Sequence, residues 1–173
     1  MCFSQGCYLA AATLLLHQVN HPDQPPPFKS AIFICGGAPL LLAESLGFEI
    51  GEDIWAMDRV GRDQLARQAD SGAILAKGAE RWVGSGSEAG TLDEEVLRSV
   101  MQGPVRIEIP TVHVYGEKDP RYTAGVLLSG LCAPERRRVF NHGGGHEIPR
   151  TSAVSGTIAE LVEWVLREGE VGC

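Results

Sequence analysis

The chain has 173 residues, of which 44% are hydrophobic and 21% charged, a composition typical of a globular domain that buries a sizeable core. Its formal net charge is −7, and its longest basic run is only Arg136-Arg137-Arg138. Nucleic acids and anionic membranes are therefore not expected partners.

No signal peptide and no membrane span is expected from the sequence. No stretch is long enough to span a membrane, and the apolar run at residues 7–16 lacks the basic flank and cleavage site of a signal peptide. The cysteines form no CxxC pair and are odd in number, so we expect free, mostly buried thiols in a reducing compartment, the cytoplasm. They are Cys2, Cys7, Cys35, Cys132 and Cys173.

The first third of the chain predicts one helix and one strand. Residues 5–17 are rich in Ala and Leu, which favours a buried helix, and the prolines at 25–27 cannot continue it. Residues 28–35 form a short apolar run that ends at Gly36-Gly37. This pattern predicts a strand covered on both faces, as in a parallel sheet.

The middle of the chain, residues 38–103, reads as a helical, lid-like insertion within a single domain of residues 1–173. Apolar positions in 52–69 follow helical spacing. Residues 91–94 (Thr-Leu-Asp-Glu) match a capping box, which predicts a helix running to Val100. Residues 84–87 (Gly-Ser-Gly-Ser) predict a surface loop, because no strand precedes them to make a dinucleotide-binding turn.

Strands and helices alternate in the last third. Residues 111–115 and 137–140 predict strands, and residues 122–131 predict the helix between them. A final helix, capped by Thr151 or Ser152, carries an apolar stripe from Val154 to Val165. The whole pattern predicts an α/β fold with a mostly parallel sheet of about three strands, flanked by helices.

Three side chains with catalytic potential occur at the ends of these elements. Ser4 directly precedes the first helix, where the N–H of Gln5 is placed to stabilise an oxyanion. Asp119 follows the strand at 111–115 and lies in an Asp-Pro turn, which favours it over the nearby Glu117 as the acid. Taken singly, a serine that caps a helix and an Asp-Pro turn are both common structural features.

A histidine completes the set after the next strand. The segment 141–149 holds His142 and His146, separated by three glycines that allow a tight bend. We expect His146 to be the general base and His142 a structural partner. A zinc site built on the two histidines would need a helix to bring them onto one face, and the glycines disfavour one; no third ligand stands out. No metal and no cofactor is therefore expected.

The order of serine, acid and histidine, each at the end of an element, is that of α/β-hydrolases. With these residues the sequence resembles the fungal FSH-type serine hydrolases, in the branch found in polyketide and toxin gene clusters. The resemblance runs from Phe3 to about Trp164 and is carried by four segments: residues 3–6, 31–37, 109–120 and 142–149. It implies a catalytic triad of Ser4, Asp119 and His146.

The resemblance also implies an activity and a substrate class. The expected reaction is hydrolysis of a small-molecule ester or acyl thioester through an acyl-serine intermediate, in fungal secondary-metabolite biosynthesis. An acyl carrier protein of a polyketide synthase is a further expected partner, as the donor of the acyl chain.

Family members carry a long segment before the nucleophile, whereas only three residues precede Ser4 here. The chain therefore reads as the C-terminal portion of such a hydrolase. Because three residues are shorter than a typical strand, we expect Ser4 to lack support and the strand at 28–35 to expose an apolar edge. Cys2, where the family usually has Gly, is expected to crowd the turn. The alternative function is accordingly a catalytically inactive, truncated remnant with a binding role or none.

Overall fold

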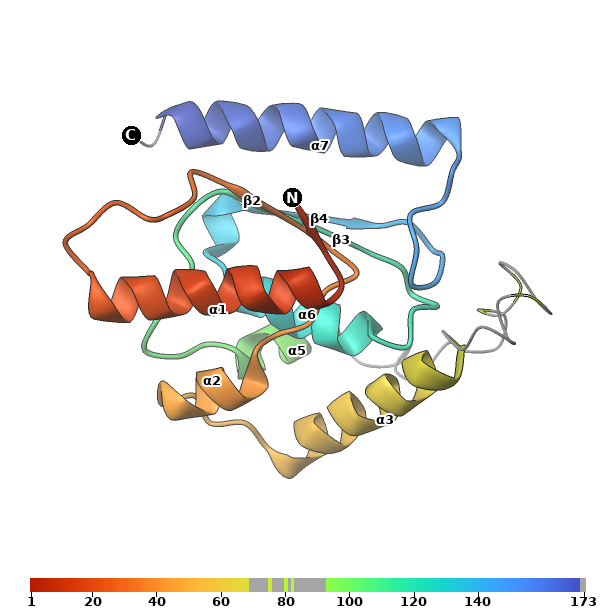
Figure 1. Cartoon of the computed structure of the whole chain (residues 1–173), viewed down its shortest axis with the longest axis horizontal. Helices are drawn as coiled ribbons and strands as arrows, with labels where there is room; N and C mark the ends of the chain where they lie inside the picture. Colours follow the sequence, from red (N-terminus) through yellow and green to blue (C-terminus); the bar gives the residue numbers. More distant parts are fainter. Residues whose placement is uncertain (69–74, 76–79, 81, 83–92, 172–173) are drawn as a thin grey trace.

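Four parallel strands form the centre of the fold, in the order β1-β2-β3-β4. The structure is a computed structural model that describes residues 1–68, 75, 80, 82 and 93–171 (Figure 1). The strands are β1 (Cys2–Phe3), β2 (Ala31–Ile34), β3 (Thr111–Tyr115) and β4 (Arg137–Asn141). This parallel α/β sheet confirms the predicted fold class.

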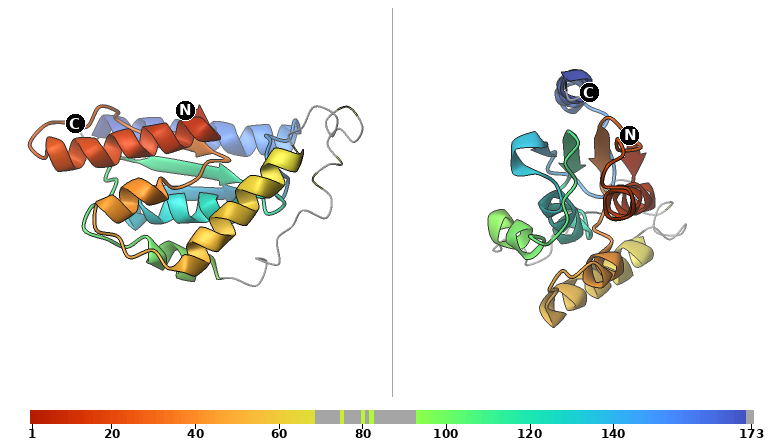
Figure 2. Two further views of the ribbon diagram at one scale, coloured as in Figure 1. Left: turned by 60° about the horizontal axis from the view of Figure 1, so that its bottom comes forward. Right: turned by 90° about the vertical axis from the view of Figure 1, so that its left-hand side faces the viewer.

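Helices cover both faces of the sheet. Figure 1 shows α7 (Ser152–Val171) alone on one side, and α1 (Gln5–Asn20), α5 (Glu94–Val100) and α6 (Tyr122–Gly130) on the other. The helices α2 (Leu40–Ser45) and α3 (Glu52–Gln68) lie farther from the sheet on that second side, as the turned views of Figure 2 also show. A short 3₁₀ turn, Pro134–Arg136, leads into β4.

Alternation along the buried strands separates the core into two layers. Phe33 packs with residues of α1 and α6, whereas Ile32 and Ile34 pack with Val165 of α7. Because side chains of a strand point to alternate faces, a strand that is buried on both faces must be apolar throughout. The continuous run in residues 31–34 satisfies that requirement, and all four are buried.

The strand before Ser4 is present, so the sheet has four strands rather than the expected three or so, and the edge of β2 that was expected to be uncovered is covered in part. Cys2 and Phe3 pair with Phe33 and Ile34 of β2, and the Cys2 thiol donates to the Ile32 carbonyl at 3.3 Å. Two residues suffice because parallel pairing needs only backbone groups in register. β1 covers the second half of β2.

Cys2 also fits the turn better than its bulk suggests. A Cβ atom placed on Gly6 would lie 3.5 Å from the Cys2 Cβ, an ordinary van der Waals separation. The four cysteines among the described residues are free thiols, three of them buried and Cys2 half-buried. This agrees with the expectation for those four.

The segment of residues 38–103 contributes α2, α3 and α5 among the described residues. The predicted helix that ends at Val100 is confirmed, but the predicted capping residue is wrong. The N-cap is Asp93, whose side chain accepts a hydrogen bond from the Glu95 N–H at 2.9 Å. Asp93 caps well because its short carboxylate also complements the positive helix end. Thr91, Ala69 and the loop 84–87 lie outside the described residues.

None of the described helices is both long and apolar enough to cross a lipid bilayer.

Candidate active site

Ser4 is the single residue between the end of β1 and the start of α1, and its backbone is held at both ends. Its N–H donates to the Ile34 carbonyl at 2.9 Å, and its carbonyl accepts from the Cys7 N–H at 3.0 Å. Its φ of 51° lies in the left-handed region that L-residues avoid. The structure thus holds Ser4 firmly in a sharp turn, contrary to the expectation that it would lack support.

Ser4, His146 and Asp119 form a continuous hydrogen-bonded chain. The Ser4 Oγ lies 2.9 Å from His146 Nε2, and His146 Nδ1 lies 2.9 Å from Asp119 Oδ2. The Asp119 side chain is 1% exposed and that of His146 10%. The three residues predicted from separate parts of the sequence are therefore brought together, in the arrangement that suits proton transfer from serine to imidazole.

Both carboxylate oxygens of Asp119 are occupied. Oδ2 faces His146, and Oδ1 accepts the Arg121 N–H at 2.7 Å. The Asp119 N–H in turn donates to the Gly116 carbonyl at 3.0 Å, which closes the turn after β3. Glu117, the competing acid, is exposed to solvent and does not reach His146. The position at the turn therefore decides which acid faces the imidazole.

The turn after β3 is packed directly against the glycine loop after β4. The Lys118 N–H donates to the Gly144 carbonyl at 3.0 Å. A Cβ atom on Gly116 would lie only 2.0 Å from that same carbonyl oxygen, so no larger residue fits there without moving one of the loops. This contact sets the distance between the acid turn and the loop that carries His146.

His142 lies half-buried in the loop after β4. Its Nδ1 accepts the Gly144 N–H at 3.1 Å, and burial lowers the pKa of its imidazole, which keeps the ring neutral. Among the described residues, the one group of three possible metal ligands is Cys35, Asp119 and His146, with ligand atoms within 4.8 Å of one another. His142 is not a member of that group.

The start of α1 supplies a candidate oxyanion donor. Gln5 is the first residue of this 16-residue helix, so its N–H has no carbonyl within the helix to bind. The positive end of the helix dipole lies at the same point. Gln5 and Ser4 both line one cavity, which places this N–H next to the nucleophile.

That cavity has a volume of about 670 Å³ and opens beside Ser4 and His146. Its apolar lining comes from α1 through Tyr8 and Leu9 and from α3 through Leu65 and Ala66. The Gly36-Gly37-Ala38 segment after β2 lines it too. A volume of this size suits an acyl chain, and α3 provides the lining residues that sequence reasoning left unassigned within 38–103.

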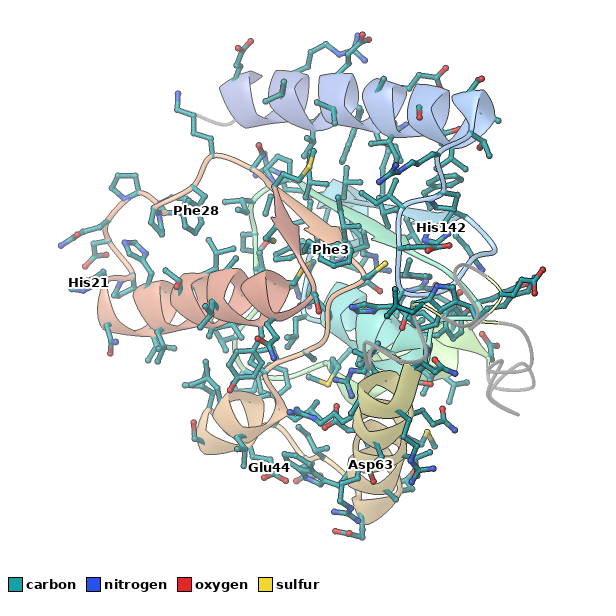
Figure 3. All side chains as sticks on the ribbon, turned by 45° about the vertical axis from the view of Figure 1, so that its right-hand side comes forward. Phe3, His21, Phe28, Glu44, Asp63 and His142 are labelled. Atoms are coloured by element: carbon teal, nitrogen blue, oxygen red, sulfur yellow. The ribbon has the colours of Figure 1, made fainter. Side chains whose placement is uncertain are left out.

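Aromatic residues near His146 were not predicted as part of the site. The Phe3 ring centroid lies 5.3 Å from that of His146, and the buried Trp82 ring lies 6.3 Å away. Figure 3 labels Phe3 and His142, which both lie at the level of the sheet, between α7 and α3. A Cβ on Gly145 would meet Trp82 Cγ at 2.2 Å, so the small residue allows this packing. No local pattern identifies these neighbours, because they meet only through the fold.

Cys35 is a further neighbour of Asp119 that the sequence did not predict. It follows β2 with a φ of 48°, and burial together with the adjacent Asp119 raises the pKa of its thiol. The thiol therefore stays protonated and acts as a small apolar group behind the triad.

The sequence comparisons agree with this geometry. The family described as Serine hydrolase (FSH1) matches residues 1–158. Esterase FPY3 of Fusarium mangiferae is 30% identical over 98% of this chain and 57% of its own length. Hydrolase FUB4 of Fusarium oxysporum f. sp. lycopersici is 29% identical over 92% of this chain and 63% of its own. Esterase alnB of Emericella nidulans is 26% identical over 97% of this chain and 66% of its own length.

The chain thus spans about three fifths of the length of these fungal relatives. No solved structure matches it. The family match covers most of the chain and includes Ser4, Asp119 and His146, the three residues that the fold joins by hydrogen bonds. The chain belongs to the FSH1 serine hydrolase family.

Proposed function

We propose that the protein hydrolyses a small-molecule carboxylic ester or thioester through an acyl-serine intermediate. The observation that supports this most directly is the pair of 2.9 Å contacts from Ser4 Oγ to His146 Nε2 and from His146 Nδ1 to Asp119 Oδ2. A serine is a weak nucleophile unless a base accepts its proton, and here the base is in hydrogen-bond reach.

The proposed reaction has two halves. In the first, Ser4 Oγ bonds to the substrate carbonyl carbon while its proton passes to His146 Nε2, and the Gln5 N–H stabilises the resulting oxyanion. The intermediate then expels the alcohol or thiol, which takes the proton from His146. In the second half, water gives a proton to His146 Nε2 while its oxygen bonds to the acyl carbon. The bond from that carbon to Ser4 Oγ then breaks, Ser4 Oγ takes the proton back from His146, and the carboxylic acid is released.

Asp119 has the third role in this proposal. By accepting from Nδ1–H of His146, it keeps the Nε2 lone pair directed at Ser4 and stabilises the imidazolium that forms. The Arg121 N–H on its other oxygen stops the carboxylate from rotating away. The reaction requires no cofactor.

The biological setting that we propose is fungal secondary metabolism, with an acyl group delivered as a small-molecule ester or by an acyl carrier protein. The support is the family and its fungal relatives, which include an esterase of Fusarium mangiferae and an esterase of Emericella nidulans. The competing function is an inactive family member with a binding role. What favours that alternative is the short β1, in which two residues hold the turn before Ser4.

Labelling with a serine-directed fluorophosphonate, together with hydrolysis of p-nitrophenyl esters, tests the proposal. We expect the label on Ser4 and ester cleavage that is lost in Ser4→Ala. The exposed Ser45, whose hydroxyl binds only the Leu42 carbonyl within the described part of the chain, is the matched control: Ser45→Ala should label and cleave as the wild type does. Folded protein with an unmodified Ser4 would establish the inactive alternative instead.

A further inference from the structure

The cavity beside Ser4 carries positive charge on a protein that is otherwise acidic. Among the described residues that line it, the charged side chains are Arg62 and Arg121, and no carboxylate faces it. The chain as a whole has a formal net charge of −7. Two arginines in the lining of an apolar cavity therefore need an explanation other than general surface charge.

Both arginines contact the same buried carboxylate, that of Asp58, but in different ways. The Asp58 side chain, 3% exposed, accepts from Arg121 Nη2 at 2.7 Å through Oδ1 and from Arg62 Nε at 2.6 Å through Oδ2. Arg121 Nη1 also donates to the Asp58 carbonyl at 2.9 Å. The Arg121 side chain is only 10% exposed, and both of its terminal nitrogens bind Asp58. This ion pair connects α3 to the turn that carries Asp119.

Arg62 is in a different position. Its side chain is 56% exposed, and within the described part of the chain Asp58 is its only hydrogen-bond partner, through Nε. Among the described residues its two terminal nitrogens have no hydrogen-bond partner, and Arg62 lines the cavity. Within that part of the chain one carboxylate lies between two guanidinium groups, which leaves one positive charge uncompensated at this wall.

We propose that Arg62 binds an anionic oxygen group of the substrate, a carboxylate or a phosphate that lies away from the scissile carbonyl. The inference rests on the proposed hydrolase function and specifies its substrate class: an ester or thioester with an apolar acyl part and a remote negative charge. A guanidinium held at Nε presents its terminal N–H groups as a fork, the geometry that matches carboxylate and phosphate. The apolar stretch from Leu65 and Ala66 of α3 lies in the same cavity and accommodates the uncharged part.

Two pairs of probes distinguish the possible sources of the anion. For a carboxylate on the acyl side, p-nitrophenyl hexanoate is compared with mono-p-nitrophenyl adipate, which has the same chain length and a terminal carboxylate. For a phosphate on the thiol side, hexanoyl-pantetheine is compared with hexanoyl-4′-phosphopantetheine. We expect kcat/KM to favour the charged member of one pair by about ten-fold, the effect of one charge-assisted hydrogen bond.

The variants then assign that preference. Arg62→Gln should reduce the charged-to-neutral ratio of kcat/KM to about one, since the ratio within each enzyme cancels any general effect on the fold or the triad. Arg59→Gln is the matched control, because Arg59 is an exposed arginine of the same helix that pairs with Glu52 and does not line the cavity. It should keep the wild-type ratio.

A wild-type ratio near one for both pairs, or a preference that survives in Arg62→Gln, overturns the inference and leaves the hydrolase proposal intact. Calorimetric binding of the same four compounds to Ser4→Ala covers the case in which the wild type cleaves none of them. Tighter binding of a charged member, abolished by the added Arg62→Gln substitution, would then support the inference while the proposed function fails. Equal binding within each pair, or none, would overturn it.

Discussion

Gly116→Ala is a direct test of how the two active-site loops are aligned. A Cβ atom at residue 116 would lie 2.0 Å from the Gly144 carbonyl oxygen and 2.5 Å from its carbon, where real Cβ atoms essentially never come closer than 3.0 Å. The loops must therefore separate by about 1 Å. These two neighbours are backbone atoms, and a third, His142 Cε1, lies 2.6 Å away. Rotation of the His142 side chain alone therefore cannot relieve the clash.

The expected effect on chemistry follows from that displacement. The turn after residue 116 carries Asp119, and the loop around Gly144 carries His146, so the separation acts on their 2.9 Å contact. A misplacement of about 1 Å in a catalytic group costs on the order of a hundred-fold in rate. The rate constant for fluorophosphonate modification of Ser4 should fall by about that factor, while the free energy of unfolding measured in urea falls by about 1–3 kcal/mol.

Gly156→Ala provides the control for a glycine-to-alanine change as such. Residue 156 lies on an exposed face of α7, and a Cβ there meets nothing within 4 Å. The labelling rate should stay at the wild-type value, and the stability should rise by about 0.5–1 kcal/mol through helix propensity. If folded Gly116→Ala labels Ser4 within two-fold of the wild type, the reasoning about loop alignment is refuted.

Three further changes test other parts of the structure. Asp119→Asn should lower kcat for ester hydrolysis by about 10⁴-fold with little change in fold, because the amide holds the wrong tautomer of the imidazole; a wild-type rate would mean that another acid serves. Gly61→Ala places a Cβ 2.4 Å from the Pro120 carbonyl oxygen and should cost about 1–3 kcal/mol of stability, readable as a lower urea midpoint. His113 is fully buried, and burial lowers its pKa from 6.5 to about 3. The unfolded chain therefore binds the proton on His113 more tightly than the folded chain does. The free energy of unfolding should be unaffected by His113 above pH 6.5 and should fall as the pH drops from 6.5 toward 3, by about 2 kcal/mol at pH 5. His113→Leu should remove that part of the pH dependence, and an unchanged slope would contradict the assignment.

The local patterns in the sequence predicted most of the sheet and the helices that flank it. The strand at 111–115 and the helices after Ser4 and before Val100 follow from apolar runs, periodicity and turn residues that act over a few positions. The three residues Ser4, Asp119 and His146 could be named for the same reason, since each lies where a predicted element begins or ends. Parallel strands then bring those ends to one edge of the sheet.

Local patterns failed where a feature depends on pairing across the chain. Two residues, Cys2 and Phe3, look too few for a strand, and only the hydrogen bonds to β2 make them one. The N-cap of α5 is Asp93 and not the predicted Thr91. Both residue types favour an N-cap and they lie two positions apart, but the helix has one start. The sequence offers no means to choose between such neighbours.

The cavity beside Ser4 was decided by the tertiary structure alone. Asp58 and Arg121 are separated by 63 positions, yet their ion pair fastens α3 to the acid turn and so places Leu65, Ala66 and Arg62 around the space beside Ser4. Such contacts leave no periodic trace in the sequence, because each partner alone reads as an ordinary helix or loop residue. The sequence thus determined which residues lie at the ends of the elements around Ser4, while long-range packing determined the cavity that surrounds them.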